Sequence, residues 1–221
     1  MNPMTSQHQL LDTLAQVARA LGNGHRLALL ERLAQGGAAV ETLASTAGLT
    51  VGNASQHLQQ LRRAGLVTAN RSGKQMIYHL TDERIVTLTG LLRQVAETNL
   101  AEMERLVSRL FADDDAEGAL EAVSRDELLV GLESGKVALL DVRPEEEFEA
   151  GHLPEAINIP LAQLEDMLDK LPQDREIVAY CRGPYCALSH EAVQRLRQLG
   201  YRVRRFEEGY PEWKAAGLPV T

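Results

Sequence analysis

Apolar residues in the first half of the chain recur every three or four positions in four segments, which predicts four helices. These segments are Leu10–Leu21, His25–Leu33, Val40–Ala47 and Val51–Ala64. Leu66–Thr68 and Met76–Leu80 alternate apolar and polar residues instead, which predicts two strands joined by the polar tip Asn70–Lys74. A continuous apolar stripe then predicts one long helix over Asp82–Leu110, long enough to serve as a dimer face.

The second half of the chain alternates short apolar runs with helical patterns. The apolar runs, which predict strands, are Val137–Val142, Ile157–Ile159, Ile177–Tyr180 and Arg202–Phe206. The helical patterns are Ser124–Glu133, Leu161–Leu171 and Ala187–Leu199. This alternation predicts an α/β domain with a parallel sheet. Asp141 and Cys181 lie at or just past strand ends, which is where ligands gather in open α/β sheets.

Charge divides the chain in the same place as the hydrophobic pattern. Within the net charge of −8, residues 1–111 carry 11 Lys and Arg against 8 Asp and Glu, and the remainder carries 12 against 23. A mildly basic half beside a strongly acidic one indicates two domains with different partners. We therefore predict a first domain over residues 1–112, an acidic linker at 113–118 and a second domain over residues 119–221.

The apolar runs of the chain are all short. None approaches the ~18 residues that a membrane span needs, and residues 1–9 lack the basic-then-apolar pattern of a secretory signal. We therefore expect a cytoplasmic protein without a membrane partner.

The third and fourth predicted helices form a helix-turn-helix pattern around Gly48, with Thr50 placed to cap the second helix. Side chains that suit base edges or phosphates cover the exposed faces of this helix and the hairpin tip. These DNA-binding candidates are Asn53, Ser55, Gln56, His57, Gln59, Gln60, Arg62, Arg63, Arg71 and Lys74. The alternative is a small helical bundle with a solvated polar helix.

Two motifs in this half, Ser55–Val67 and Arg71–Tyr78, resemble the recognition helix and wing of the ArsR/SmtB family, and the resemblance covers about residues 8–110. It implies a mainly-α winged helix-turn-helix domain that binds double-stranded operator DNA as a homodimer. Many relatives sense metals through cysteines or through His and Asp pairs. The corresponding stretch Ala38–Ala44 holds no Cys, and no His occurs over residues 80–111, so no metal ligation is expected here.

The only two cysteines of the chain, Cys181 and Cys186, lie in one short stretch between a predicted strand and a predicted helix. The backbone N–H groups and positive dipole end of a helix stabilise a thiolate at such a turn. Because two cysteines form no disulfide framework, free thiols are the default expectation. The sequence therefore concentrates candidate chemistry in this loop.

Four motifs in order resemble the rhodanese superfamily over about residues 119–221. They are Asp141–Phe148, Gly151–Pro160, Cys181–Cys186 and Glu208–Trp213. The resemblance implies that Cys181 accepts a sulfane sulfur as a persulfide, while Asp141 and Arg143 organise the site and Arg182 supplies positive charge. It also implies that backbone N–H groups of residues 182–187, among them Gly183, Tyr185 and Ala187, cradle the developing anion. No cofactor is expected.

Cys186 departs from the family, because rhodaneses that use thiosulfate often carry Arg or Lys at that position. One interpretation makes Cys186 a small buried residue, and the other makes it a resolving thiol that closes a disulfide or polysulfide bridge with Cys181. A zinc site with His190 would lack a fourth ligand nearby.

Three functions remain open from the sequence. The first is a transcriptional regulator, a repressor in our interpretation, whose second domain senses a small sulfur donor or oxidant through Cys181. The second is a sulfurtransferase enzyme for which the winged helix serves dimerisation or location. The third is a regulator with an inactive rhodanese fold that serves as an interaction module.

Overall fold

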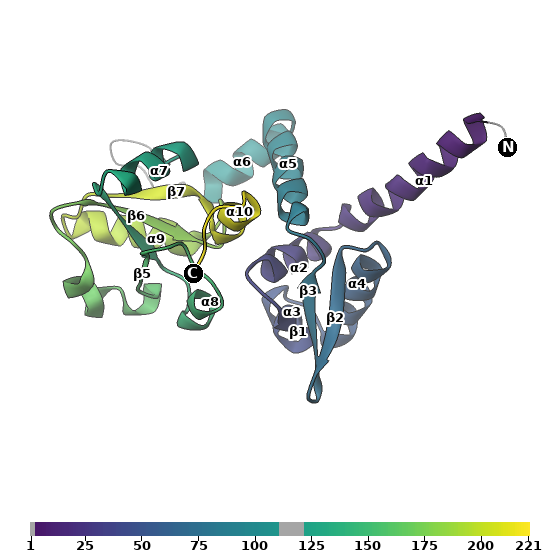
Figure 1. The fold of residues 1–221 in the computed structure, drawn as a ribbon, viewed down its shortest axis with the longest axis horizontal. Coiled ribbons are helices and arrows are strands. Elements are labelled where there is room, and N and C mark those ends of the chain that lie inside the picture. The colour runs from purple at the N-terminus through teal and green to yellow at the C-terminus, as the bar shows by residue number, and fades with distance from the viewer. Residues whose placement is uncertain (1–2, 111–121) are drawn as a thin grey trace. The chain divides into compact units, whose positions relative to one another are not determined.

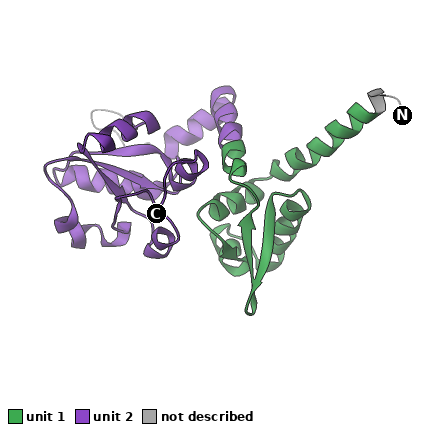
Figure 2. Cartoon of the chain, viewed as in Figure 1, with its two compact units in different colours: residues 1–89 green, residues 90–221 purple. Residues whose placement is uncertain are grey.

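The computed structural model describes residues 3–110 and 122–221, and its internal contacts divide the chain into two units. The first unit comprises residues 1–89 and the second residues 90–221 (Figure 2). The predicted linker at residues 113–118 lies outside the described residues, so the predicted domain boundaries stay a prediction.

The first unit contains the four predicted helices and the predicted hairpin (Figure 1). Its helices are α1 (Pro3–Leu21), α2 (Gly24–Ala34), α3 (Val40–Thr46) and α4 (Val51–Arg63). Its strands are β1 (Ala38–Ala39), β2 (Val67–Ser72) and β3 (Gln75–Leu80). All neighbours in this sheet are antiparallel, in the order β1-β3-β2. This is the winged helix-turn-helix fold that the sequence predicts.

The turn between α3 and α4 forms for the reasons that the sequence indicates. Gly48 adopts a φ of 63°, a left-handed conformation that glycine takes at little cost. The Thr50 hydroxyl accepts a hydrogen bond from the Asn53 N–H at 3.2 Å, which confirms Thr50 as the cap of α4. Leu58 and Leu61 of α4 are fully buried, so this helix presents its polar faces outward.

The sequence predicted one continuous helix over Asp82–Leu110, and that prediction is wrong because the structure has two helices there. The structure has α5 (Arg84–Asn99) and α6 (Ala101–Leu110), with Leu100 outside both. The Asn99 side-chain amide donates to the Val95 carbonyl at 2.8 Å. Asparagine competes in this way with the helical backbone bonds, which ends α5. The hairpin tip is also shorter than expected, because Asn70 and Arg71 belong to β2.

The second unit contains a parallel four-stranded sheet in the order β5-β4-β6-β7, which confirms the predicted α/β domain. Its strands are β4 (Val137–Asp141), β5 (Ile157–Asn158), β6 (Glu176–Cys181) and β7 (Val203–Gly209). Its later helices are α7 (Arg125–Glu133), α8 (Glu145–Glu149), α9 (Ala187–Gln198) and α10 (Tyr210–Ala215). The short helices α8 and α10 lack an apolar periodicity long enough to predict from sequence.

The central strands β4 and β6 bury both faces, because helices cover the sheet on two sides. Ala179 and Cys181 point to the side of α9 and join its buried residues in one core. Val178 and Tyr180 point to the opposite side and pack with residues of α7 and α10. The side-chain alternation of a strand thus places Cys181 at the end of β6 on the α9 side of the sheet.

The segment predicted as a helix over Leu161–Leu171 forms two 3₁₀ segments instead, η1 (Leu161–Gln163) and η2 (Glu165–Lys170). Met167 has a φ of −123°, outside the helical region, which interrupts the second segment. Leu171 precedes Pro172, and helical backbone angles are sterically disfavoured at the residue before a proline. The segment still buries Leu164 in the core on the α9 side.

Gly209, the last residue of β7, packs directly on the backbone that follows β6. A Cβ atom there would lie 2.4 Å from the Gly183 nitrogen and 2.6 Å from the Cys181 oxygen. We therefore expect Gly209→Ala to destabilise the protein by about 1–3 kcal/mol, because neither backbone can move freely. Urea unfolding measures this loss. Gly90→Ala is the control, because its Cβ meets nothing within 4 Å; equal stability of the two variants would contradict the prediction.

Candidate functional site

The loop that carries both thiols connects the end of β6 to the start of α9. Cys181 is the last residue of β6 and is 1% exposed, and Cys186 is the residue that caps the N-terminus of α9. The Cys186 N–H donates to the Gly183 carbonyl at 3.1 Å, which closes a tight turn inside the loop. The two sulfur atoms are therefore held beside a helix N-terminus.

A disulfide joins Cys181 and Cys186, with their Cα atoms 6.2 Å apart. This separation lies within the range that disulfides require. The sequence made free thiols the default expectation, and the structure corrects that expectation for this pair. The physical reason is the short loop, which brings two thiols five positions apart within bonding distance.

Asp141 and Arg143 form an ion pair at the end of β4, and both side chains are 0% exposed. The Arg143 guanidinium donates to both Asp141 carboxylate oxygens and to the Gly151 carbonyl. Burial alone would lower the pKa of Arg143, but its hydrogen bonds with Asp141 raise it. The Asn158 amide donates to the backbone oxygens of both residues at 3.0 Å. These two hydrogen bonds of Asn158 tie the segment that contains the ion pair to β5.

Aromatic rings enclose this ion pair. The Arg143 guanidinium carbon lies 4.6 Å from the centre of the Tyr210 ring and 5.7 Å from that of Tyr180. The Tyr180 hydroxyl accepts a hydrogen bond from the Leu153 N–H at 3.1 Å. Burial is the main cause that raises the pKa of Tyr180, so its phenol stays neutral. These contacts fix Arg143 in place, and the role of Asp141 and Arg143 in organising the site stays a prediction.

Arg182, the residue after Cys181, is paired with Glu147 of α8. Its guanidinium donates to both oxygens of that carboxylate, over distances from 2.6 to 3.1 Å. A bidentate pair of this kind fixes the arginine in position and balances its charge. The positive charge predicted from the sequence is thus present at the loop, but it is matched by the Glu147 carboxylate, for which the sequence predicted no such pairing.

Two further contacts hold the middle of the loop against the sheet. The Arg205 guanidinium on β7 donates to the Pro184 carbonyl at 3.0 Å. Glu212 of α10 accepts from the Gly209 N–H at 3.1 Å, and Gly183 lies beside its carboxylate. Burial raises the pKa of Glu212 above its usual range. The loop is therefore fixed by charged side chains of α8, β7 and α10.

In the first unit, most of the DNA-binding candidates lie exposed on α4 and the hairpin. The exposed candidates are Asn53, Gln56, Gln59, Gln60, Arg62, Arg63, Arg71 and Lys74. Ser55 and His57 are half-buried. The His57 ring lies 5.7 Å from the His25 ring, and burial is the main cause that lowers the pKa of His57.

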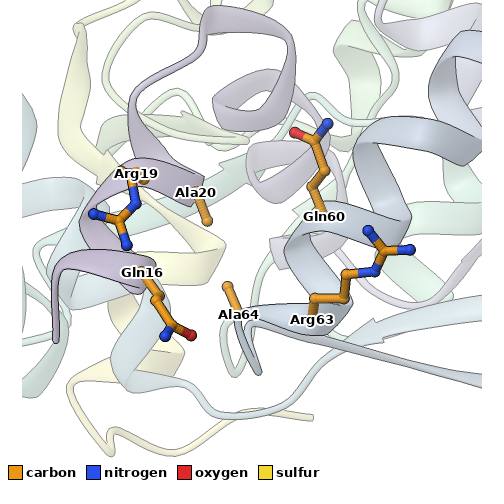
Figure 3. Close-up of a pocket in the computed structure, with 6 residues that line it drawn as sticks. All are labelled: Gln16, Arg19, Ala20, Gln60, Arg63 and Ala64. Atoms are coloured by element: carbon orange, nitrogen blue, oxygen red, sulfur yellow. The ribbon is translucent and has the colours of Figure 1, made fainter. Parts of the chain in front are cut away.

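Arg26 of α2 links α4 to α1. Its guanidinium donates to the Gln60 side chain at 2.6 Å and to the Arg19 carbonyl at 2.8 Å. A small hollow lies beside this link, and its walls come from the two joined helices. Figure 3 shows its lining side chains, which are Gln16, Arg19, Ala20, Gln60, Arg63 and Ala64. Gln60 therefore has a partner inside the domain as well as an exposed surface.

Two family models match the chain, one in each half. Residues 21–69 match a helix-turn-helix domain, and residues 124–216 match a rhodanese-like domain. A helix-turn-helix-type transcriptional regulator of Mycobacterium tuberculosis is 44% identical over 211 residues, which cover 96% of this chain and 91% of that protein. This likeness extends across both halves and decides the family. The chain belongs to the ArsR-type transcriptional regulators that carry a C-terminal rhodanese-like domain.

Other relatives of this regulator match one half only. Human thiosulfate:glutathione sulfurtransferase is 36% identical over 106 residues, 41% of this chain and 90% of that protein. A homodimeric winged helix-turn-helix domain of Mycobacterium bovis, solved by NMR and described as a possible ArsR-family regulator, is 41% identical. It covers 43% of this chain and 89% of its own, with a TM-score of 0.40.

The described part of the regulator contains no cluster of three or more His, Cys, Asp or Glu side chains suited to a metal ion. Within residues 3–110 and 122–221, no helix is long and apolar enough to cross a membrane.

Sequence reasoning identified the thiols, Asp141, Arg143 and Arg182 of this regulator, but not the groups that hold the loop. Glu147 belongs to the motif Asp141–Phe148, but it is one of four glutamates within α8, and no contact with the loop was predicted for it. Arg205 and Glu212 reach the loop only because β7 folds beside β6. Such contacts follow from the order of the strands in the sheet, and no local sequence pattern predicts them.

We expect Asp141→Ala to destabilise the regulator by about 3–5 kcal/mol, because it leaves Arg143 buried without its anionic partner. Urea unfolding of the second domain measures the change. The control is Glu102→Ala, which removes an exposed partner of Arg105 on α6 and should cost at most about 1 kcal/mol. Equal stability of Asp141→Ala and the wild type would show that the buried pair has no structural role.

Proposed function

We propose that this regulator binds operator DNA as a homodimer and that its rhodanese-like domain adjusts this binding by sensing reactive sulfur through Cys181. The observation that carries the proposal is the position of the two thiols. Cys181 ends a central strand, and Cys186 caps the next helix within disulfide distance. The described regulator thus joins a DNA-binding fold to a pair of thiols that can change their covalent state.

The first unit supports DNA binding through its exposed α4 side chains and its basic hairpin. Amide and guanidinium groups on α4 suit base edges and phosphates in the major groove. Arg71 and Lys74 at the hairpin suit backbone phosphates. The Arg26 link holds α4 against α1, so the recognition helix is positioned by the same helix that we assign to the dimer.

Homodimer formation is supported by apolar side chains that the single chain leaves exposed. Leu10, Leu11 and Leu14 of α1 are between 55% and 72% exposed. A second set lies on α5, on α6 and at Leu100 between them, and comprises Leu88, Leu91, Leu92, Val95, Leu100, Leu106 and Leu110. Apolar stripes of this extent are typical of a surface that another chain covers. We assign both sets to the dimer face.

The proposed chemistry uses an alkyl persulfide as the sulfur donor. The Cys181 thiolate attacks the outer sulfur of R–S–SH, a new S–S bond forms, and RS⁻ leaves, so that Cys181 becomes a persulfide. The Cys186 thiolate then attacks the Cys181 sulfur and expels HS⁻, which leaves the Cys181–Cys186 disulfide. The two thiols are oxidised by two electrons, and the transferred sulfur is reduced to hydrogen sulfide.

A second candidate function is a sulfurtransferase that passes the sulfur of the Cys181 persulfide to a thiol acceptor. The similarity of residues in the second half to a human sulfurtransferase favours it. The paired charges of Arg182 and Glu147 favour a donor of low charge over thiosulfate, which is a dianion. In this alternative the winged helix would serve dimerisation or location. The third possibility, an inactive interaction module, requires Cys181 to resist alkylation and sulfur donors.

We expect Lys74→Ala to weaken DNA binding similarly for all sequences, because Lys74 faces phosphates rather than bases. The slope of log affinity against log salt should fall in magnitude by about 0.9 for each lost phosphate contact, which is about 1.8 for a homodimer that loses one in each subunit. Fluorescence anisotropy on a duplex selected for binding to the reduced protein gives this slope. Lys136→Ala in the second unit is the matched control and should leave the slope unchanged. An unchanged slope in Lys74→Ala would exclude Lys74 from the DNA interface.

We expect an alkyl persulfide to weaken DNA binding of the reduced wild type, by about 5-fold or more for a coupling of ordinary size. Cys181→Ser should abolish this response, because it removes the attacking thiolate. Cys186→Ser should accumulate the Cys181 persulfide without a disulfide, which intact-protein mass spectrometry detects as one added sulfur atom. The affinity measurement is made at fixed salt concentration. An undiminished response in Cys181→Ser would overturn the proposed sensor.

A further inference from the structure

The second half of α5 contacts the cysteine loop within the unit formed by residues 90–221. Arg93 and Glu97 lie one helical turn apart on α5. The Tyr185 hydroxyl donates a hydrogen bond to the Glu97 carboxylate, and the Arg93 guanidinium carbon lies 5.7 Å from the centre of the Tyr185 ring. Arg93 also lies 3.6 Å from a carboxylate oxygen of Glu212. A helix outside both matched family segments thus holds the loop.

Partial burial makes these contacts stronger than ordinary surface contacts. The side chains of Arg93 and Glu212 are 19% and 16% exposed, and that of Glu97 is 37% exposed. Charges interact more strongly where water is partly excluded. The Tyr185 ring beside Arg93 and Glu97 therefore has a defined place, rather than one of many positions on a solvated surface.

Tyr185 lies inside the ring that the disulfide closes, and it directly precedes Cys186. A ring of six residues restricts the backbone angles of every residue within it, and opening the ring restores that freedom. The other loop contacts run elsewhere: Arg182 binds Glu147 on α8, and the Pro184 carbonyl binds Arg205 on β7. Among the described contacts of the loop, the Tyr185 side chain binds α5 directly.

The other end of α5 belongs to the winged-helix core. Ile85, in the first turn of α5, is 6% exposed and packs in the same core cluster as Leu58 and Leu61 of α4. One continuous helix, Arg84–Asn99, therefore takes part in the core that supports the recognition helix and in the contact with the thiol loop.

We propose that Tyr185 is the residue that transmits the covalent state of the Cys181–Cys186 loop to α5 through its contacts with Glu97 and Arg93. This inference rests on the proposed function and names the residue through which the cysteine loop acts on α5. The closed disulfide ring holds Tyr185 against α5, and the open dithiol releases it. The position of α5 then differs between the two states, and the winged-helix domain shares that helix.

The test uses Tyr185→Phe in the full chain, because this change removes only the hydroxyl that binds Glu97 and keeps the backbone N–H of residue 185 that the predicted anion cradle would use. We expect the variant to form the Cys181 persulfide and the disulfide as the wild type does, by mass spectrometry after treatment with an alkyl persulfide. Its DNA affinity should change less than 2-fold on that treatment, against about 5-fold or more in the wild type. Glu97→Ala removes the acceptor of the same hydrogen bond and should behave in the same way.

Tyr201→Phe is the matched control. It removes a tyrosine hydroxyl of the same domain that binds the Leu168 carbonyl away from the loop, so it should keep the wild-type response. A full response in Tyr185→Phe would overturn the inference and leave the proposed function standing. Failure of Tyr185→Phe to form the disulfide would also overturn it, because Tyr185 would then act on the chemistry. An unchanged affinity in wild type with modified Cys181 would overturn both proposals.

Discussion

The site depends on one constraint: the chain must pass from the end of β6 to the start of α9 in a few residues. Cys181 cannot move, because it is buried within the core on the α9 side of the sheet. Cys186 is restricted as well, because it occupies the N-cap position of α9 and its N–H donates to the Gly183 carbonyl. The short connection therefore fixes the distance between the two thiols and places both beside a helix N-terminus. The close packing of Gly209 on the same backbone leaves the loop no alternative path.

Charges surround this loop in matched pairs. Asp141 with Arg143 is fully buried and organises the segment after β4, whereas Arg182 with Glu147 and Arg93 with Glu212 are partly exposed and hold the loop itself. Such matching leaves little net attraction for a highly charged donor such as a dianion. The cations of these three pairs thus have structural partners, and under the proposed function the loop would respond to a covalent change at sulfur rather than to the arrival of charge.

The sequence predicted most of the fold, because its elements depend on local patterns, and it singled out the loop that holds the only two cysteines of the chain. Continuous apolar runs marked the buried strands, and Thr50 marked the start of α4. The sequence did not predict the end of α5 at Asn99. The hydrogen bond from the Asn99 side chain to the Val95 carbonyl does not alter the spacing of apolar residues from which the helix was predicted. The contact between Tyr185 and Glu97 was missed for another reason. The two residues lie 88 positions apart, and one sequence contains no signal for a pair so distant.

The central claim, that the sulfur state of the loop and DNA binding are coupled, is tested most directly by the reciprocal effect. If the disulfide weakens DNA binding, operator DNA must stabilise the dithiol to the same extent. The midpoint reduction potential of the Cys181–Cys186 pair is measured with and without saturating duplex, at one salt concentration. Coupling of this sign predicts a less negative reduction potential in the presence of DNA. The shift should be about 30 mV for each tenfold change in DNA affinity that the redox state of one Cys181–Cys186 pair produces. Identical potentials with and without DNA would contradict it.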